Sequence, residues 1–449
     1  MSGPTDEQLA RLSATTLADN WWHDHTVPSR ILYPYQWSWD TGFIAVGLAR
    51  VAPERAWHDL RTLFSAQWAD GRVPHIVFDN PADRGEPAHE SYFPGPGFWR
   101  SIGVPGAPAR PTTGLVQPPV HALAAWEVYR QAPHADARAL AVDQLRQLFP
   151  RMVAQHRYLT VRRDLGGGGL AALVHPWESG QDNSPAWDAA LAAVPADLAL
   201  LERYRRRDLD RSHRSHRPTD LDYARYIHIA QCYRSFDYAD DGHGGEYPFL
   251  VECPAFNAIL GAAEVALAQI AQVIGQDPAP HLAAAQHLTD ALVERLYDPA
   301  TGMFHARDLH TGQLSPVRYL GGLIPLILPD LPSAQVKTLL AEASSPAFGL
   351  AEQMRLPLPS YDLTAEDLDP LRYWRGPIWI NMNWLVWRGL RQHGQGALAA
   401  SLRHAMLELV RGNGCYEYFH AHTGEGIGAH EFSWTAALVL DLLANPPGR

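Results

Sequence analysis

The chain has 449 residues, of which 46% are hydrophobic and 19% charged, and its formal net charge is −11. This composition supplies a large core and excludes a disordered chain. The acidic balance argues against binding to nucleic acid or to an anionic membrane surface, because both need a basic protein surface. The 15 tryptophans and 17 tyrosines exceed the needs of an ordinary core and are typical of sites that stack on sugars.

The cysteines and the N-terminal residues indicate the cellular compartment. Three cysteines are an odd number without a CxxC pair, which argues against a disulfide framework and a structural zinc site. The first residues lack the basic start and apolar run of a signal peptide, and no uninterrupted apolar stretch approaches the roughly 20 residues that span a bilayer. We therefore expect a cytoplasmic protein with no metal, no cofactor and no membrane partner; the sequence leaves a homo-oligomer open.

Apolar residues recur at helical spacing along most of the chain. In chain order, the pattern predicts helices over residues 6–22, 41–51, 53–68, 118–132, 135–163, 188–207, 219–235, 256–275, 279–297, 317–328, 333–343, 377–393, 395–411 and 431–444. Strand-like alternation is scarce and short. The helices follow one another in pairs, which predicts an all-α fold with a single (α/α)6 barrel over residues 1–449. An α-solenoid is the alternative, but the sequence shows no fixed-period repeat.

The non-helical stretches are unusually rich in Trp, Tyr, Gly, Pro and acidic residues. They cover residues 33–42, 91–117, 174–188, 372–384 and 416–434. Each lies immediately before or between predicted helices, so in a helical barrel they gather at one end, where loops carry function. Residues 72–117 and 203–250 are long enough to form a cap or lid over that end.

One of these stretches, HPWESGQDNSPAWD (residues 175–188), contains three acids. Asp188 begins a predicted helix, and Glu178 can bond backbone amides of the SGQ turn. Asp182 is the acid that capping and packing explain least. Trp177 and Trp187 nearby would exclude water, raise the pKa of the Asp182 carboxyl group and keep it protonated, as a general acid requires.

Two further acids stand in aromatic surroundings. Asp40 follows two tryptophans in QWSWDTGF, where it either caps the next helix or binds sugar hydroxyls. Glu417 lies between Tyr416 and Tyr418, whose hydroxyls would orient it as a base or nucleophile. The alternative for Glu417 is a surface position on a short strand. The basic run 203–217 is either a solvated helix end or a loop whose arginine clamps an anionic substrate group.

Taken in order, QWSWDTGF, GLVQPPV, HPWESGQDNSPAW, RYWRGPIWINMNW and YEYFHAHTGEG…FSWTAA resemble glycoside hydrolase family 63. The resemblance is greatest to its bacterial branch of glucosylglycerate and mannosylglycerate hydrolases, and it spans residues 33–437. It implies an inverting glycosidase on an (α/α)6 barrel. It places the general acid at Asp182, the general base at Glu417 and a sugar-binding acid at Asp40.

The same motifs and loops supply the candidate substrate-binding residues. The segment RPTDLDYARY nominates Arg217 and Tyr223 for contacts with glycerate. The other candidates are Tyr35, Trp37, Trp39, Tyr92, Gln117, Trp177, Tyr373, Trp374 and Trp379.

The resemblance implies hydrolysis of a small anionic α-glycoside, glucosylglycerate or mannosylglycerate, to a hexose and glycerate. Two alternatives stay open at the level of sequence. One is an α,α-trehalase or oligosaccharide α-glucosidase, which would share the catalytic acids. The other is a sugar isomerase or epimerase on the same barrel, which would use histidine as its acid and base.

Overall fold

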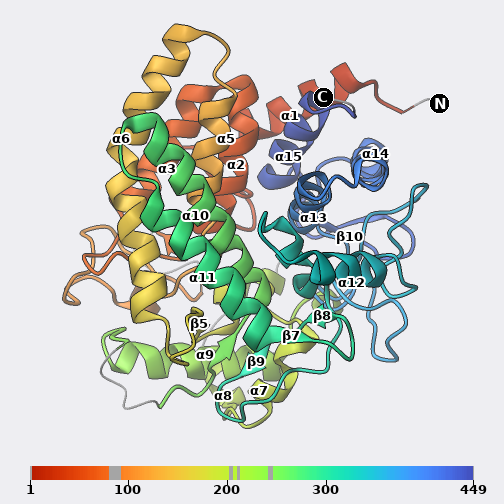
Figure 1. Ribbon diagram of the computed structural model, residues 1–449. Coiled ribbons are helices and arrows are strands. Elements are labelled where there is room, and N and C mark those ends of the chain that lie inside the picture. The colour runs from red at the N-terminus through yellow and green to blue at the C-terminus, as the bar shows by residue number, and fades with distance from the viewer. Residues whose placement is uncertain (1–2, 80–92, 202–205, 210–212, 241–245, 448–449) are drawn as a thin grey trace.

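The computed structural model describes residues 3–79, 93–201, 206–209, 213–240 and 246–447 (Figure 1). In this part of the chain, six helical segments form a closed inner ring in which each contacts the next. They are α2 (Ser38–Val51), α5 (His121–Arg130), α10 (Pro254–Ile274), the 3-10 helix Leu320–Ile327, α13 (Ile380–Gln392) and α15 (Ser433–Ala444). The ring is the inside of the predicted barrel.

An outer layer of helices packs against this ring. The outer helices are α1 (Asp6–Asp19), α3 (Pro53–Ser65), α6 (Ala135–Arg157), α11 (Ala279–Leu296), α12 (Ser333–Ala343) and α14 (Gly396–Asn413). Each packs on a member of the ring, for example α3 on α2, α11 on α10 and α1 on α15. The two layers make an (α/α)6 barrel, which confirms the predicted fold class.

The inner helices are apolar around most of their circumference because they are covered on both sides. Of the 21 residues of α10, 16 are buried. By length and composition α10 could also cross a membrane, but 72% of its most apolar stretch is buried inside the molecule. We therefore interpret α10 as a buried helix that lies between the core of the barrel and the outer layer.

Three predicted helices differ from the structure. The segment 188–207 is broken into α7 (Asp188–Ala192) and α8 (Leu198–Leu201), because Pro195 cannot continue the helix. The segment 317–328 forms only the 3-10 helix Leu320–Ile327, which contains Pro325. The predicted helix 135–163 ends as α6 at Arg157 and continues in a wider π turn over Tyr158–Arg162.

Short antiparallel ladders fix the segments that lead into the inner helices. The strand β3 (Gln36–Trp37) directly precedes α2 and pairs with β4 (Ile76–Val77). The strand β6 (Val251–Glu252) precedes α10 and pairs with β5 (Ala172–Leu173) and β9 (Arg307–Asp308). The strand β10 (Tyr418–Phe419) pairs with β11 (Gly426–Ile427) ahead of α15. The other ladders join β1 (Trp21–Trp22) to β2 (His25–Thr26), and β7 (Tyr297–Asp298) to β8 (Met303–Phe304).

The two long segments expected to form a cap are described in part. Residues 72–117 contain β4 and the short helix α4 (Pro96–Trp99), and residues 203–250 contain α9 (Asp220–Ser235). Thr219 caps α9, and its hydroxyl accepts a hydrogen bond from the Asp222 amide, as a capping box requires. Both segments contribute side chains to the pocket described next. Their role as a cap stays a prediction.

Candidate active site

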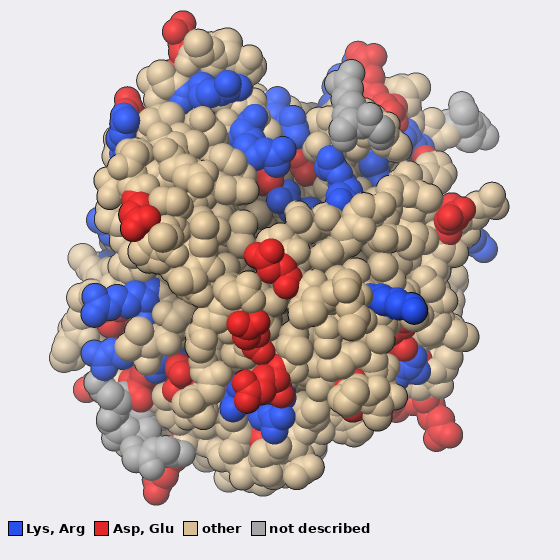
Figure 2. Space-filling model, in the orientation of Figure 1, with Lys and Arg blue, Asp and Glu red and all other residues tan. Residues whose placement is uncertain are grey.

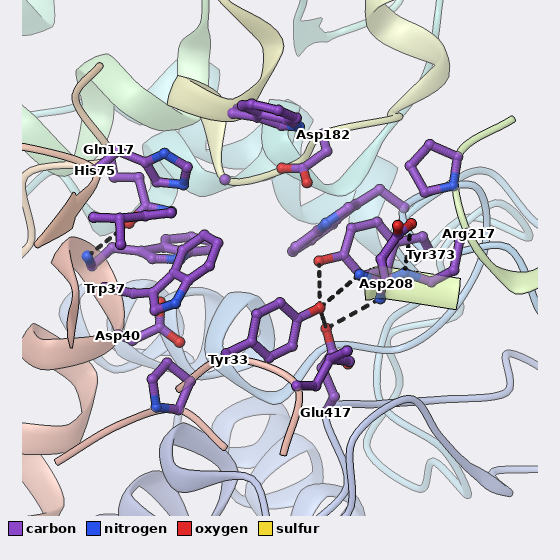
Figure 3. A pocket seen from close by; sticks show the side chains of 18 of the residues that line it. Tyr33, Trp37, Asp40, His75, Gln117, Asp182, Asp208, Arg217, Tyr373 and Glu417 are labelled. Carbon is purple, nitrogen blue, oxygen red and sulfur yellow. Dashed lines mark hydrogen bonds and ion pairs between the residues drawn. The ribbon is translucent and has the colours of Figure 1, made fainter. Parts of the chain in front are cut away.

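A pocket opens at the N-terminal ends of α2, α13 and α15, where the aromatic loops gather (Figure 3). Of the candidate site residues named from the sequence, 11 line this pocket. They are Trp37, Trp39, Asp40, Gln117, Trp177, Asp182, Arg217, Tyr223, Tyr373, Trp374 and Glu417. Segments separated by more than 300 residues in sequence are thus brought together around one cavity.

Two of the described candidates, Trp379 and Tyr35, do not appear in the lining of the pocket. Trp379 is fully buried and stacks on Trp374, with ring centroids 3.9 Å apart, so that it supports the pocket wall from behind. Tyr35 is buried with its ring edge-on to Phe78 at 5.0 Å. Tyr92 lies outside the described residues. Trp379 and Tyr35 thus pack in the aromatic layer around the pocket, and their contact with the sugar stays a prediction.

The pocket also contains three polar residues that the sequence analysis did not select, Tyr33, His75 and Asp208. Tyr33 begins the motif YPYQW, but nothing in the sequence predicts its hydrogen-bond partner. His75 is buried, and its ring lies edge-on to Trp37 at 4.7 Å. Burial lowers the pKa of His75 well below its ordinary value, so its imidazole is neutral.

Asp182 projects into the pocket from the side opposite Glu417 (Figure 3). Its backbone carbonyl accepts a hydrogen bond from the Tyr226 hydroxyl at 3.0 Å. The adjacent Asn183 accepts one from the Trp374 amide at 2.9 Å. Burial raises the pKa of Asp182 to about 7; the Arg217 charge opposes this shift and the Glu417 charge adds to it. The carboxyl group can therefore carry a proton near neutral pH.

The turn before Asp182 places this carboxyl group. Gly180 has φ +69°, and a Cβ atom at that position would lie 2.5 Å from the Trp39 ring. The Trp187 indole donates to the carbonyl of Gln181 at 2.7 Å. Trp177 lines the pocket, whereas Trp187 lies beneath the turn, so only one of the two tryptophans faces the cavity beside Asp182.

Glu178 has a structural role, but with other partners than expected. Its carboxylate forms an ion pair with Arg163 at 2.6 Å, and both side chains are fully buried. It also accepts hydrogen bonds from the amides of Val174 and Val116, at 2.8 and 3.2 Å. Glu178 thus joins the turn to two other segments and does not close the SGQ turn itself. Asp188 begins α7, as expected, and pairs with Arg375 at 2.7 Å.

Glu417 is buried just before β10 and is held through both carboxylate oxygens. The Tyr33 hydroxyl donates to Oε1 at 2.7 Å, and the Ala429 amide donates to Oε2 at 3.0 Å. Tyr416 and Tyr418, the donors expected from the sequence, do not hold this carboxylate. They are its neighbours in the chain, and neighbouring side chains of an extended segment point to opposite faces. The hydroxyl donor therefore comes from another loop, as Tyr33 does.

Asp40 lies in the first turn of α2 and is only 3% exposed. The N-cap position belongs to Trp37, so Asp40 is not the cap of this helix. Burial raises the pKa of Asp40 well above its usual range, and the charges of Glu417 and Asp182 add to the shift. The pocket therefore brings four carboxyl groups together, because Asp208 also lines it, and their mutual repulsion favours protonation of some of them.

Arg217 supplies the positive charge of the pocket and is 4% exposed, which excludes a solvated helix end for this residue. Its Nη2 donates to the Tyr33 hydroxyl at 2.7 Å, and its guanidinium lies 4.1 Å from the centre of the Tyr373 ring. Its Nη1 lies 3.5 Å from Glu417. Its Nε lies 3.7 Å from Asp208. Both Nε and Nη1 are buried without a hydrogen-bond partner among the described residues.

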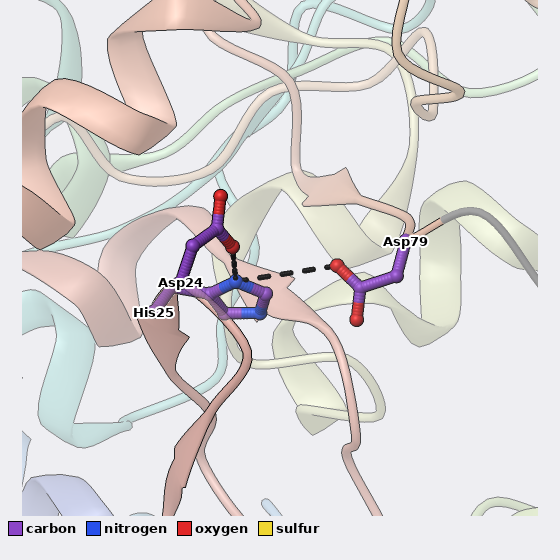
Figure 4. Close-up of side chains that lie close together, drawn as sticks. All are labelled: Asp24, His25 and Asp79. Carbon is purple, nitrogen blue, oxygen red and sulfur yellow. Dashed lines mark hydrogen bonds and ion pairs between the residues drawn. The ribbon is translucent and has the colours of Figure 1, made fainter. Parts of the chain in front are cut away.

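A cluster with metal-ligand chemistry lies elsewhere, near the N-terminus. Asp24, His25 and Asp79 hold their ligand atoms within 4.8 Å of one another (Figure 4). Arg110 already approaches this cluster, with its guanidinium 3.3 Å from Asp79 and 3.7 Å from Asp24. Because a guanidinium balances the carboxylates, we interpret the cluster as an ion-pair network.

Comparisons with known proteins agree with this architecture. The family model of the MGH1-like glycoside hydrolase domain of mannosylglycerate hydrolase matches residues 33–435. The chain is 38% identical to mannosylglycerate hydrolase of Rubrobacter radiotolerans and 35% identical to glucosylglycerate hydrolase of Mycolicibacterium hassiacum, in both cases over 98% of each chain. The crystal structure of a family 63 mannosylglycerate hydrolase from Thermus thermophilus in complex with Tris is 38% identical, with a TM-score of 0.87 over 96% of this chain and 99% of that one.

These likenesses extend over the barrel, the aromatic loops and the segments that carry the acids. They do not support the alternative of a sugar isomerase or epimerase. The chain belongs to glycoside hydrolase family 63, in its MGH1-like group, and is a glycoside hydrolase.

Proposed function

We propose that the protein hydrolyses the α-glycosidic bond between a hexose and glycerate, with inversion at the anomeric carbon. The substrates are glucosylglycerate and mannosylglycerate, which the related hydrolases of Mycolicibacterium hassiacum and Rubrobacter radiotolerans carry in their names. The relative from Thermus thermophilus has been solved with D-glycerate and with glucose. The three free cysteines fit the cytoplasmic location that we propose.

Asp182 acts as the general acid in this proposal. A glycosidic oxygen leaves only when it is protonated, and a carboxyl group with a pKa of about 7 still holds its proton near neutral pH. The neutral acid donates its proton to the oxygen that departs with glycerate.

Glu417 acts as the general base on the other side of the pocket. Its two oxygens are oriented by Tyr33 and Ala429, which fixes the direction in which the carboxylate can accept a proton from water. Inverting glycosidases hold their two carboxyl groups about 6.5–9.5 Å apart, so that a water fits between the base and the anomeric carbon. Asp40, at the N-terminal end of α2, binds hydroxyl groups of the hexose.

The observation that supports an anionic substrate is that Arg217 is buried with two donor atoms that lack hydrogen bonds in the described part of the chain. A guanidinium that is 4% exposed, with two donor atoms lacking hydrogen bonds among the described residues, is costly unless a ligand completes it. A carboxylate accepts charge-assisted hydrogen bonds from such donor atoms. The second sugar of trehalose carries no charge and would offer these two donor atoms no charge-assisted hydrogen bond, so we favour glycerate over a second hexose.

The test of the reaction is hydrolysis of glucosylglycerate and mannosylglycerate in parallel, followed by proton NMR in the first minutes. We expect the β-anomer of the hexose to appear first and the α-anomer to grow later by mutarotation. An α-anomer formed first would mean retention and would contradict the assignment of Glu417 as a base. Hydrolysis of trehalose but of neither glycerate compound would contradict the proposed substrate.

The test of the substrate charge is Arg217→Gln, assayed with glucosylglycerate and with glucosylglycerol, in which a hydroxymethyl group replaces the carboxylate. We expect kcat/KM to fall about 100-fold or more with glucosylglycerate, as for loss of a charge-assisted pair, and much less with glucosylglycerol. Arg214→Gln is the matched control, because Arg214 belongs to the same segment, has a side chain that is 68% exposed and does not line the pocket. Equal losses with both substrates would contradict the role of Arg217.

A further inference from the structure

A second cavity, of about 620 Å³, lies at the other end of the barrel, around the C-terminal ends of α2, α13 and α15. Asp40 and Arg50 mark the two ends of α2, and their separation of ten residues corresponds to roughly 15 Å along a helix axis. Figure 2 shows a hollow bordered by basic side chains near the upper edge of the molecule, where the C-terminus lies in Figure 1. This cavity shares none of its lining residues with the catalytic pocket.

The lining of the second cavity is rich in positive charge. Four arginines, Arg50, Arg130, Arg388 and Arg391, share it with the two carboxylates Glu127 and Asp441. The formal charge of this group is therefore +2, in a chain with a net charge of −11.

Each carboxylate of the cavity is already engaged. Glu127 contacts Arg388 at 2.7 Å and Arg130 at 3.2 Å. Asp441 contacts Arg50 at 3.1 Å and accepts a hydrogen bond from the Trp384 indole at 2.9 Å. Burial acts to raise the pKa of Glu127, but the charges of the two arginines outweigh it and lower the pKa. Because the arginines outnumber the carboxylates, the lining of the cavity stays positively charged after these ion pairs have formed.

Part of this charge complements the helix ends. Arg50, Arg130 and Arg391 stand in the last turns of α2, α5 and α13, where the helix dipole favours a cation. Arginines on a surface without a cavity would stabilise the helix dipoles equally well. The dipoles therefore do not explain why the arginines line a cavity large enough for a small ligand. They also do not explain Arg388, which lies earlier in α13.

Two other features of the cavity suit hydroxyl groups and a sugar ring. The side-chain carbonyl oxygen of Gln131 is buried without a hydrogen-bond partner among the described residues, and it can accept from a hydroxyl. The partly buried indole of Trp126, which stacks on Tyr129 with centroids 5.3 Å apart, offers an apolar surface.

We propose that this second cavity binds a small phosphorylated sugar, with the phosphate held by the arginines and the hydroxyl groups placed toward Gln131 and Trp126. A phosphate monoester carries nearly two negative charges at neutral pH, which matches the formal charge of the lining. Its oxygen atoms also fit the planar donor fork of arginine. The ligand binds about one helix length from the glycosidic reaction and makes no contact with the residues of the catalytic pocket.

The proposal is tested by calorimetric titration of the whole protein with glucose 6-phosphate, inorganic phosphate and glucose, with the ionic strength held constant by NaCl. We expect saturable one-to-one binding of glucose 6-phosphate, with the same affinity when excess glucose occupies the catalytic pocket, and weaker binding of inorganic phosphate. Absence of saturable binding, or equal affinity for glucose 6-phosphate and inorganic phosphate, would overturn the proposal.

Variants distinguish this cavity from the catalytic pocket, whose Arg217 could also attract a phosphate. Arg391→Gln and Arg50→Gln should each weaken binding of glucose 6-phosphate tenfold or more and leave glycoside hydrolysis unchanged. Arg146→Gln is the matched control, because Arg146 is 59% exposed and pairs only with Asp143 among the described residues. Arg217→Gln should bind normally. Binding that is lost in Arg217→Gln but kept in Arg391→Gln would place the ligand in the catalytic pocket and refute the second site.

Discussion

At the scale of single residues, the chemistry of the pocket depends on how neighbouring groups change the pKa of the Asp182 carboxyl group. Asp182 is an ordinary aspartate in sequence, but it shares an aromatic cavity with three other acids. Burial and the charge of Glu417 favour its protonated form, while Arg217 opposes them. The balance leaves the pKa of Asp182 near neutral pH, where a general acid is most effective in an enzyme that works at that pH.

This balance predicts the pH dependence of hydrolysis. Because Asp182 must be protonated to donate, kcat/KM should fall as the pH rises above about 7, by close to tenfold for each further pH unit. Asp182→Asn should lower kcat by about 10²–10⁴-fold and remove this alkaline limb. A steady-state pH profile of both proteins checks the prediction, and an unchanged alkaline limb in the variant would assign the titration to another group.

The same shift predicts an effect on stability with a definite sign. The folded-state pKa of Asp182, about 7, lies above its unfolded value near 3.8, so the folded protein holds the proton more tightly. Between these two values stability falls as the pH rises, because burying the ionised carboxylate is unfavourable. Asp182→Asn should therefore raise Tm relative to the parent protein at pH 8 and have little effect at pH 4. Thermal unfolding at the two pH values measures the difference; an equal shift at both would contradict it.

At the scale of elements, the turns ahead of the inner helices determine where the functional side chains lie. The turn at Gly180 needs a left-handed backbone and also passes directly over the Trp39 ring. A one-residue change in this turn would move Asp182, which follows two residues later. The helices hold the loops in place, and the loops carry the reacting groups.

Gly180→Ala tests this arrangement. The added methyl group would clash with Trp39, so we expect kcat/KM to fall at least tenfold although every proposed catalytic residue is retained. Gly275→Ala is the matched control, because Gly275 ends α10 with φ +77° and a Cβ atom there meets nothing within 4 Å. Both variants should lose about 1 kcal/mol of stability from the backbone conformation alone. Comparable activity losses in the two variants would show that backbone strain, and not the contact with Trp39, is responsible.

At the scale of the whole molecule, buried ion pairs join segments that are far apart in the chain. Arg163, after α6, pairs with Glu178 in the loop that carries Asp182, and Glu178 also accepts the amide of Val116 beside Gln117. These contacts are fully buried, so each charge depends on its partner. The catalytic loop is thereby fixed to the outer layer of the barrel.

Arg163→Met should destabilise the protein by about 3–5 kcal/mol, because it leaves the Glu178 carboxylate buried without its counter-charge. The surface pair Arg146–Asp143 gives the control, since Arg146→Met should cost at most about 1 kcal/mol. Denaturant unfolding of both variants measures the two values. A loss for Arg163→Met as small as that of the control would mean that solvent reaches Glu178.

The sequence by itself determined the helical barrel and the acids, because helical spacing of apolar residues and local aromatic motifs are properties of short segments. Asp182 could be selected because turn and capping chemistry explained its two neighbouring acids better. Tertiary structure alone decided that Tyr33, and not Tyr416 or Tyr418, holds Glu417, and that Trp379 stands behind the pocket wall. The contact between Tyr33 and Glu417 joins residues 384 positions apart, and its geometry depends on how the inner helices close into a ring. Local sequence patterns do not predict the geometry of that closure.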